Sequence, residues 1–501
     1  MAKHIYENKQ VWFITGSQDL YGDETLQQVA DHSKKMVEKL NDAGGLPVQL
    51  VWKPVVLTSA GIADTMTEAN SSTECIGVIT WMHTFSPAKM WIRGLTILSK
   101  PLLHLHTQFN RDIPWESIDM DFMNLNQSAH GDREYGYVGA RLGIKRRVVA
   151  GYWQEPAVQQ EVSTWMRAAA GWHESNNLRI ARFGDNMRSV AVTEGDKVEV
   201  QIALGIQVDG YGVGDLVAVC DAVPAAEVQG LVAEYQKLYS FSPELLGNKD
   251  AMQAVAEQAR IELGLRSFLD AGGYKGFTTT FENLHGLPQL PGLAVQRLMA
   301  DGYGFGAEGD WKHAALVRIV KVMDAGLPGG SSFMEDYTYH MDPNNSMVLG
   351  AHMLEICPSI AAADTKPAMQ VHPLGIGGKK DPARLVFDGD GGKAVNVSLV
   401  DMGNRLRLIV NEVEAQRPTK KMPNLPVARV LWKPQPDFKT GLEGWILAGG
   451  AHHTAFSTAI SAQHIADFAE MAGVELIKIG SETTIDTLNR DLLLSDLAAR
   501  R

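Results

Sequence analysis

The feature that most constrains the fold is a change of pattern near residue 328. Before it, strand-like runs such as VWFITG alternate with helical runs such as ETLQQVADHSKKMVEKL. This alternation is typical of parallel sheets covered by helices. After it, short β-patterned runs such as SMVLGAHMLEI and AVNVSLVDM follow one another, separated by turns such as MGN. The sequence therefore predicts an α/β chain whose C-terminal part is an antiparallel barrel or a sandwich.

The 501 residues are enough for two or three domains with sizeable cores. A second α/β segment opens at LRIARFGDNM and ends with the amphipathic run WKHAALVRIVKVM, whose apolar residues recur at helical spacing. We therefore predict a parallel α/β domain at 1–175, a central α/β domain at 176–327 and a β-rich domain at 328–501.

Composition and charge exclude several classes of protein. The net charge is -12 and no long basic run offsets it, which argues against nucleic acid and anionic membranes as partners. The three cysteines lie far apart in apolar contexts, so we expect reduced core residues. The start, MAKHIYENKQ, is polar, and no segment approaches the roughly 18 apolar residues of a membrane span. These features predict a cytoplasmic protein.

The first strand and its loop, VWFITGSQDLYG, have some likeness to a dinucleotide site. The loop lacks the second and third glycines of the G-x-G-x-x-G fingerprint, so we do not expect a nicotinamide cofactor. A loop at the carboxyl end of a parallel strand is nevertheless a usual position for a ligand.

Carboxylates and imidazoles in the C-terminal half indicate a divalent metal site. The residues are Glu308 in GYGFGAEGDW, Glu335 in SSFMEDYTYH, His352 in GAHMLEI and the pair His452 and His453 in ILAGGAHHT. A ligand set without cysteine favours Mn²⁺, Mg²⁺, Co²⁺ or Fe²⁺ over a structural zinc. Four protein ligands leave coordination positions open on an ion that prefers six, so the set is typical of a catalytic site.

Alternation along strands indicates which side chains face the same way. Read as a strand, SSFMEDYTYH places Glu335 on one face with Phe333 and Tyr337. A carboxylate on such an aromatic face needs a partner. The same alternation in SMVLGAHMLEI puts His352 and Glu355 on opposite faces, so we predict that these two residues do not form one site.

The two adjacent histidines need a separate argument. If AHHT is extended, His452 and His453 point to opposite faces, and only one of them reaches the ion. Gly449 and Gly450 are able to introduce a bulge just upstream, so spacing alone does not say which histidine it is.

Long sequence blocks along the chain match one known family. These blocks include GSQDLYG, WMHTFSPAKMW, DMDFMNLNQSAHG, RFGDNMR, FTTTFENLHGLPQLPGLAVQRLM, SFMEDYTYH, LGAHMLEICPSIA, LGIGGKKDPARL and WILAGGAHHT. Through them the chain resembles the bacterial L-arabinose isomerase family over essentially its whole length. The resemblance implies that Glu308, Glu335, His352 and His453 bind the metal. It also implies one Mn²⁺ per subunit, with Co²⁺ or Mg²⁺ as alternative ions. The alanine before the glutamate in GAEGDW is a departure that changes no chemical group.

The same resemblance implies an architecture and a sugar pocket. We expect two Rossmann-like α/β domains followed by a β-barrel-like domain, as in fucose isomerases, and a homo-oligomer, expected to be a hexamer, with active sites near subunit interfaces. The residues implied to line the pocket are Gln18, Tyr21, Phe85, His130, Met187 and Phe281. For the aromatic and methionine positions, core packing is the alternative. Whether His130 serves its own subunit or a neighbour stays open.

The implied activity is the interconversion of L-arabinose and L-ribulose, with D-galactose to D-tagatose as a side reaction. Through an enediol, Glu308 and Glu335 act as both ligands and proton-transfer groups, and their separate roles stay open. A hydride shift between the sugar carbons is the other route. A fucose-type isomerase is the alternative enzyme. A sugar-binding receptor is the alternative outside enzymes, but it needs an export signal and has no use for the C-terminal carboxylates.

Overall fold

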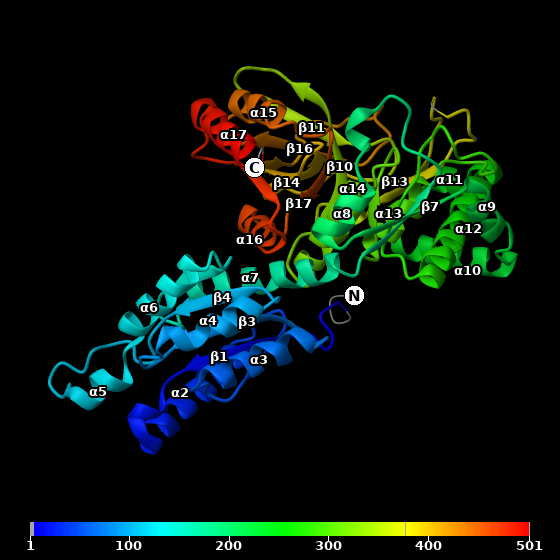
Figure 1. The fold of residues 1–501 in the computed structure, drawn as a ribbon. Coiled ribbons are helices and arrows are strands. Elements are labelled where there is room, and N and C mark those ends of the chain that lie inside the picture. Colours follow the sequence, from blue (N-terminus) through cyan, green and yellow to red (C-terminus); the bar gives the residue numbers. More distant parts are fainter. Residues whose placement is uncertain (1–4, 376, 500–501) are drawn as a thin grey trace. The chain divides into compact units, whose positions relative to one another are not determined.

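The computed structural model describes residues 5–375 and 377–499 of the chain. These residues form two compact units (Figure 1). The smaller unit comprises residues 5–173 and 466–471, and the larger one comprises residues 174–465 and 472–499. The larger unit contains both the central α/β part and the β-rich part. The division into domains at 175 and 327 therefore stays a prediction.

The smaller unit is built on a parallel sheet with the strand order β2-β1-β3-β4-β5. The strands are β1 (Gln10–Gly16), β2 (Gln49–Trp52), β3 (Cys75–Met82), β4 (Leu102–His106) and β5 (Arg147–Ala150). All eight residues of β3 are buried, as expected for a central parallel strand covered on both faces. This strand order is the flavodoxin-like doubly wound order, and it differs from the 3-2-1-4-5-6 order of the Rossmann fold.

Helices connect these strands, as the alternating pattern predicts. They are α2 (Gly22–Asp42), α3 (Ser59–Ser71), α4 (Trp91–Ile97), α5 (Met120–Leu125), α6 (Ser128–Arg141) and α7 (Pro156–Ser175), with short 3-10 turns η1 (Asp19–Tyr21) and η2 (Ala88–Met90). One core cluster joins Trp12 and Met82 of the sheet to Ile62, Trp91 and Tyr135 of the helices. The N-terminal α/β character is therefore confirmed.

The larger unit begins with a second parallel sheet, in the order β7-β6-β8-β9. Its strands are β6 (Arg179–Phe183), β7 (Gln207–Tyr211), β8 (Gly276–Thr278) and β9 (Gly304–Gly306). The connecting elements are η3 (Ala191–Thr193), α8 (Lys197–Leu204), α9 (Val213–Asp221), α10 (Ala225–Leu238), α11 (Pro243–Gly247), α12 (Lys249–Gly272), α13 (Gly292–Ala300) and α14 (Trp311–Asp324).

The β-rich part is a closed barrel and not a sandwich. Six strands pair in the cyclic order β14-β17-β10-β11-β16-β15, and β15 pairs back with β14. They are β10 (Ser331–His340), β11 (Met347–Ala351), β14 (Gly392–Asp401), β15 (Leu406–Gln416), β16 (Arg429–Pro434) and β17 (His453–Ser457). Closure leaves none of these six strands with an unpaired edge.

The remaining elements extend the barrel. Strand β18 (Glu475–Ile479) pairs in parallel with β15, and β12 (Ala368–Val371) forms a two-stranded sheet with β13 (Ala383–Val386). The other elements are η4 (Pro358–Ile360), α15 (Phe438–Leu447), α16 (Ala462–Ala472) and α17 (Ile485–Ala499).

Helix α14 differs from the amphipathic helix that its spacing predicts, because it has no exposed face. Every residue from Trp311 to Met323 is buried, including three cationic side chains. Lys312 donates to the carbonyl of Thr193, Arg318 pairs with Glu174, and Lys321 donates to the carbonyl of Ser331. The helix contacts β8 and β9 on one side and barrel strands β10, β14 and β17 on the other.

Two further expectations concern the cysteines and membranes. Cys75, Cys220 and Cys357 are buried and free, as predicted. Within the described residues, no single helix is both long and apolar enough to cross a membrane. Helices α9 and α10 pass that test only as a pair, and the chain bends by 91° between them.

Candidate metal centre

The register of the barrel brings one predicted glutamate and two predicted histidines together. Strand β10 lies between β11 and β17, and Glu335 is directly opposite Ala351 on β11 and His453 on β17. His352 follows Ala351 at the end of β11. Side chains at opposed positions of neighbouring strands are in reach of each other. The Nε2 atom of His352 lies 3.9 Å from Oε2 of Glu335.

Glu308 reaches the same place from the central sheet. It lies in the loop between β9 and α14, at the carboxyl end of a parallel strand, where ligands usually bind. Its φ of +60° is rare for a residue other than glycine and costs roughly 1–3 kcal/mol. The amide of Met187 donates to the Glu308 carbonyl at 2.9 Å. A Cβ on Gly309 would lie 2.5 Å from the Cα of Asn186, so the neighbouring loop holds this strained turn.

The resulting group has a ligand atom, Nε2 of His453, that no described residue satisfies with a hydrogen bond. Glu308, His352 and His453 each offer one ligand atom, and these three atoms lie within 4.8 Å of one another. The Nε2 atom of His453 is buried without a hydrogen-bond partner among the described residues, 3.7 Å from Oε2 of Glu308. Leaving a buried nitrogen unpaired is costly. A lone pair held in this way is what a metal ligand requires, so these residues fit a divalent cation.

Two other clusters of histidine and aspartate side chains in the described residues could hold a metal ion by their composition, but hydrogen bonds already engage their side chains. In the smaller unit, Asp132 accepts from His104 at 2.7 Å and from His106 at 2.6 Å. In the larger unit, Asp310 lies 2.7 Å from Nδ1 of His313 and 3.0 Å from Nδ1 of His453. The contacts of the Glu308 carboxylate with the rings of His452 and His453, at 3.5 and 3.7 Å, are longer than hydrogen bonds of ordinary length. The Glu308 group is therefore the open one.

Burial and neighbouring charges shift the pKa values of the two glutamates in opposite directions. Burial raises the pKa of Glu335, and the nearby His352 does not fully offset it. Burial also acts to raise the pKa of Glu308, but contact with His452 and the charge of His453 outweigh it and lower the pKa. Burial lowers the pKa of His453 to about 4, so its ring is neutral near pH 7, the form that binds metals.

The prediction that His352 and Glu355 belong to different faces is wrong. Strand β11 ends at Ala351, so alternation does not extend to the residues that follow. Nδ1 of His352 and Oε2 of Glu355 are 2.5 Å apart, and both side chains are buried. Glu355 therefore holds the side of the His352 ring that points away from Glu335.

Alternation also fails to separate His452 from His453. Strand β17 begins at His453, and His452 lies in the bend before it. The Nε2 atoms of the two rings are 3.5 and 3.7 Å from Oε2 of Glu308. The His453 side chain is fully buried, whereas that of His452 is 35% exposed. Both rings face Glu308, but His453 is the one grouped with His352.

Two of the six predicted sugar-pocket residues lie beside this centre. The ring of Phe281 is stacked on that of His352, with 6.4 Å between centroids. Met187 contacts Glu308 through its backbone amide. Their contact with a sugar stays a prediction.

The other four predicted residues lie in the smaller unit. Gln18 and Tyr21 belong to the loop after β1, and the Tyr21 hydroxyl donates to Gln127 at 3.4 Å. Phe85 follows β3, and its ring lies 4.6 Å from that of His130 on α6. These residues therefore gather at the carboxyl ends of adjacent parallel strands, the usual ligand edge. Their role in a sugar pocket stays a prediction.

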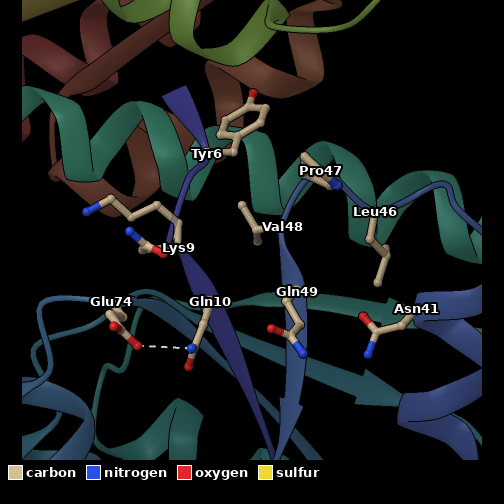
Figure 2. A pocket seen from close by; sticks show the side chains of 10 residues that line it. Tyr6, Lys9, Gln10, Asn41, Leu46, Pro47, Val48, Gln49 and Glu74 are labelled. Carbon is tan, nitrogen blue, oxygen red and sulfur yellow. Dashed lines mark hydrogen bonds between the residues drawn. The ribbon is translucent and has the colours of Figure 1, made fainter. Parts of the chain in front are cut away.

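A cavity of about 490 Å³ lies at the opposite edge of the same sheet (Figure 2). It is bordered by Gln10 and Gln49, which begin β1 and β2, and by Glu74, which accepts a hydrogen bond from Gln10 at 3.0 Å. None of the predicted site residues lines it. The amino ends of parallel strands are not the usual ligand edge, so we do not assign a function to this cavity.

Sequence patterns missed two carboxylates next to the centre, Asp310 and Asp336, and set aside a third, Glu355. The AEGDW block places Asp310 two residues after Glu308, but nothing in the pattern shows that it contacts His453. Asp336 follows Glu335 where the register of β10 and β11 becomes irregular. Burial raises the pKa of Asp336 to about 7, and the charge of Glu335 adds to the rise.

We predict that Asp336→Asn stabilises the metal-free protein at pH 8 but not at pH 3.5. As pH rises from about 4 to about 7, the unfolded chain ionises this half-buried carboxyl while the folded protein keeps it protonated, so stability is lost. Thermal unfolding in chelator should show a melting temperature a few degrees higher for the variant at pH 8. Asp364→Asn is the control, because Arg417 lowers the pKa of that carboxyl. Equal melting temperatures for Asp336→Asn and the parent at pH 8 would contradict the prediction.

Comparison with known proteins identifies the family of the chain. Three family models match in succession: the L-arabinose isomerase N-terminal domain at residues 5–177, the central domain at 179–326 and the C-terminal domain at 330–475. The L-arabinose isomerase of Geobacillus stearothermophilus is 60% identical over 96% of this chain and 97% of that protein. The L-arabinose isomerase of Clostridium beijerinckii is 58% identical over 98% of this chain and 99% of that protein. This chain therefore belongs to the L-arabinose isomerase family.

Proposed function

We propose that the protein is a metal-dependent aldose-ketose isomerase that interconverts L-arabinose and L-ribulose. Membership of the family along nearly the whole chain supports the reaction and the substrate. The observation that carries metal dependence is the unpaired, buried Nε2 atom of His453, which faces Glu308. With Glu335 and His352 alongside, the centre offers two carboxylates and two imidazoles. This set of ligands suits Mn²⁺, with Co²⁺ or Mg²⁺ as substitutes.

The two glutamates support the proton transfers that the reaction needs. A bound divalent ion supplies Lewis-acid stabilisation of the negative charge that develops on the sugar oxygens. Glu308, with its lowered pKa, stays ionised, whereas burial brings the pKa of Glu335 closer to neutrality. Two carboxyl groups whose pKa values are pushed apart are suited to different roles. Glu335 is the better group to accept and return a proton, and Glu308 the better permanent anion.

A hydride shift between C1 and C2 is the competing route, and it needs no base for carbon. Glu335, whose pKa burial raises, is able to serve as such a base, so we propose the enediol route. Substrate deuterated at C2 separates the two routes. The enediol route releases deuterium to water, whereas the hydride shift keeps it in the product.

The side reaction, the location in the cell, the domains and the sugar-binding residues are proposed from the family and the composition. D-Galactose to D-tagatose is the expected side reaction, because a pocket rejects one extra hydroxymethyl group by only about 1–3 kcal/mol. We place the enzyme in the cytoplasm and assign it three domains in a fucose isomerase-like arrangement. Gln18, Tyr21, Phe85, His130, Met187 and Phe281 are assigned to sugar binding.

Exposed apolar side chains support a homo-oligomer, for which the family suggests a hexamer. Within the short segment 113–123 of the smaller unit, Trp115 is 80% exposed and Met120 is 65% exposed. Aromatic and methionine side chains are enriched where proteins meet, and exposed apolar groups that gather in one segment are typical of such sites.

Removal of the metal tests the proposed function directly. The protein should lose ketose formation from L-arabinose after dialysis against chelator and regain it on addition of Mn²⁺. Because an ion that binds only the folded state stabilises it, Mn²⁺ should also raise the melting temperature of the stripped protein. Full activity in chelator, together with a melting curve indifferent to Mn²⁺, would rule out the metal site.

We predict that Glu308→Gln and Glu335→Gln each lower the isomerisation rate by roughly 10²-fold or more. The amide keeps the shape of the side chain but lacks the charge and the proton acceptor. Steady-state assays at saturating Mn²⁺ measure the effect. Glu234→Gln is the control, because this half-exposed glutamate pairs with Arg297 away from the centre and should leave the rate unchanged. A variant of either site glutamate with more than about a tenth of the parent rate would exclude the role of that residue.

We also predict that His453→Ala weakens Mn²⁺ binding severely, whereas His452→Ala binds Mn²⁺ more nearly like the parent. His453 supplies the unpaired Nε2 atom, and the half-exposed His452 instead sits beside Glu308. Calorimetric titration of Mn²⁺ into each metal-free variant distinguishes them. The opposite order of affinities would assign the ligand role to His452.

A further inference from the structure

Both histidines of the centre are held by a buried carboxylate on the same ring atom. Nδ1 of His453 lies 3.0 Å from Oδ2 of Asp310, and Nδ1 of His352 lies 2.5 Å from Oε2 of Glu355. In both rings the other nitrogen, Nε2, faces the glutamates Glu308 and Glu335. Two residues from different strands therefore have the same arrangement, with a carboxylate behind the ring and the centre in front.

This arrangement determines where the proton of each neutral ring lies. A neutral imidazole has one N–H and one lone pair, and a carboxylate accepts only from the N–H. Asp310 and Glu355 therefore keep the proton on Nδ1 and leave the lone pair on Nε2, where an ion would bind. Without the carboxylates, each ring is free to take the other tautomer or to rotate.

Asp310 is itself fixed from several sides. Its carboxylate caps the first turn of α14 by accepting from the amide of His313 at 3.2 Å, and it also accepts from the ring of His313 at 2.7 Å. The far nitrogen of the His313 ring lies 2.9 Å from the hydroxyl of Ser398 on β14. The ammonium of Lys312 is 3.6 Å away. Because all these groups are buried, Asp310 has no room to swing away from His453.

Glu355 is anchored locally. Its Oε2 atom also accepts from the backbone amide of Leu354 at 3.0 Å. This contact fixes the carboxylate in the bend that follows β11, directly behind His352. The anchors of Asp310 and Glu355 come from different elements, so the two pairs are structurally independent.

We propose that Asp310 and Glu355 are positioning residues that make His453 and His352 bind a metal through Nε2 and thereby set the metal affinity of the centre. The inference rests on the proposed metal site and extends it to two residues that do not touch the ion. Carboxylates that orient ligand histidines typically change metal affinity 10–100-fold. The alternative is that both pairs only stabilise the core.

Metal affinity, measured separately from stability, distinguishes these alternatives. Full-length protein is stripped with chelator, dialysed and titrated with Mn²⁺ by calorimetry, as the parent and as Asp310→Asn and Glu355→Gln. The melting temperature of each metal-free protein is recorded in parallel. Glu262→Gln is the matched control, because Glu262 is a buried carboxylate that pairs with Arg266 and Arg297.

We expect the dissociation constant for Mn²⁺ to rise 10–100-fold in Asp310→Asn and Glu355→Gln. Glu262→Gln should have a lower melting temperature than the parent but the same affinity for Mn²⁺. Activity at saturating Mn²⁺ should recover largely in the two positioning variants, because Glu308 and Glu335 are intact. Affinities within about threefold of the parent in both variants would overturn the inference.

Two further variants keep the outcome interpretable. Glu308→Gln changes a proposed ligand and should lose Mn²⁺ binding. If it does, and both positioning variants bind Mn²⁺ normally, the metal site is supported and the inference is rejected. A parent protein that binds no Mn²⁺ would instead reject the proposed function. If Glu355→Gln fails to fold, Glu355→Asp keeps the charge on a shorter side chain. Parent-like Mn²⁺ affinity in Glu355→Asp together with lowered Mn²⁺ affinity in Asp310→Asn supports positioning by charge. Parent-like Mn²⁺ affinity in both variants overturns the inference.

Discussion

The burial of α14 between the central sheet and the barrel is the constraint on which the rest of the larger unit depends. The helix contacts β8 and β9 on one side and β10, β14 and β17 on the other, with no exposed face from Trp311 to Met323. A helix packed on all sides fixes the segment that leads into it. That segment carries Glu308 and Asp310, so one packing arrangement sets both a candidate ligand and the carboxylate behind His453.

The barrel supplies the other half of the centre through its register. Because β10 pairs with β11 and β17 at once, Glu335 lies opposite both Ala351 and His453. A shift of one residue in either pairing would turn Glu335 away from its partners. Closure of the barrel makes such a shift unfavourable, since all six strands would have to adjust together. The fold thus places charged groups at a precision that a single loop could not maintain.

Much of the fold was predictable because periodicity is a local property. The alternating strands and helices of the N-terminal half and the short strands after residue 328 are confirmed. Closure of the barrel was not predictable, because it depends on the pairing of β14 with β15 and β17, which no local pattern encodes. The exposed face expected for α14 was wrong for the same reason. Lys312, Arg318 and Lys321 look solvated in the sequence, but distant carbonyls and Glu174 satisfy them.

The candidate site, too, was predictable only in part. The family blocks point to Glu308, Glu335, His352 and His453, and the structure brings these four side chains together. Reasoning from strand alternation dismissed Glu355, because it assumed that β11 continues beyond Ala351. Alternation holds only where the strand does, and functional residues often lie just past the end of a strand. Asp310 was missed because its partner His453 is far away in sequence.

The centre concentrates several unfavourable features that a bound cation would offset together. Glu308 has a strained backbone, Glu335 is a partly buried carboxylate with a raised pKa, and His453 keeps a buried nitrogen unpaired. Each feature alone costs stability, by roughly 1–3 kcal/mol in the case of the strained backbone. The three residues are neighbours: Nε2 of His453 lies 3.7 Å from Oε2 of Glu308, and Glu335 is opposite His453 in the barrel, which random imperfections of packing would not produce. A divalent ion bound there would neutralise the carboxylates and pair with the free nitrogen, so the instability of the arrangement would become affinity for the ion.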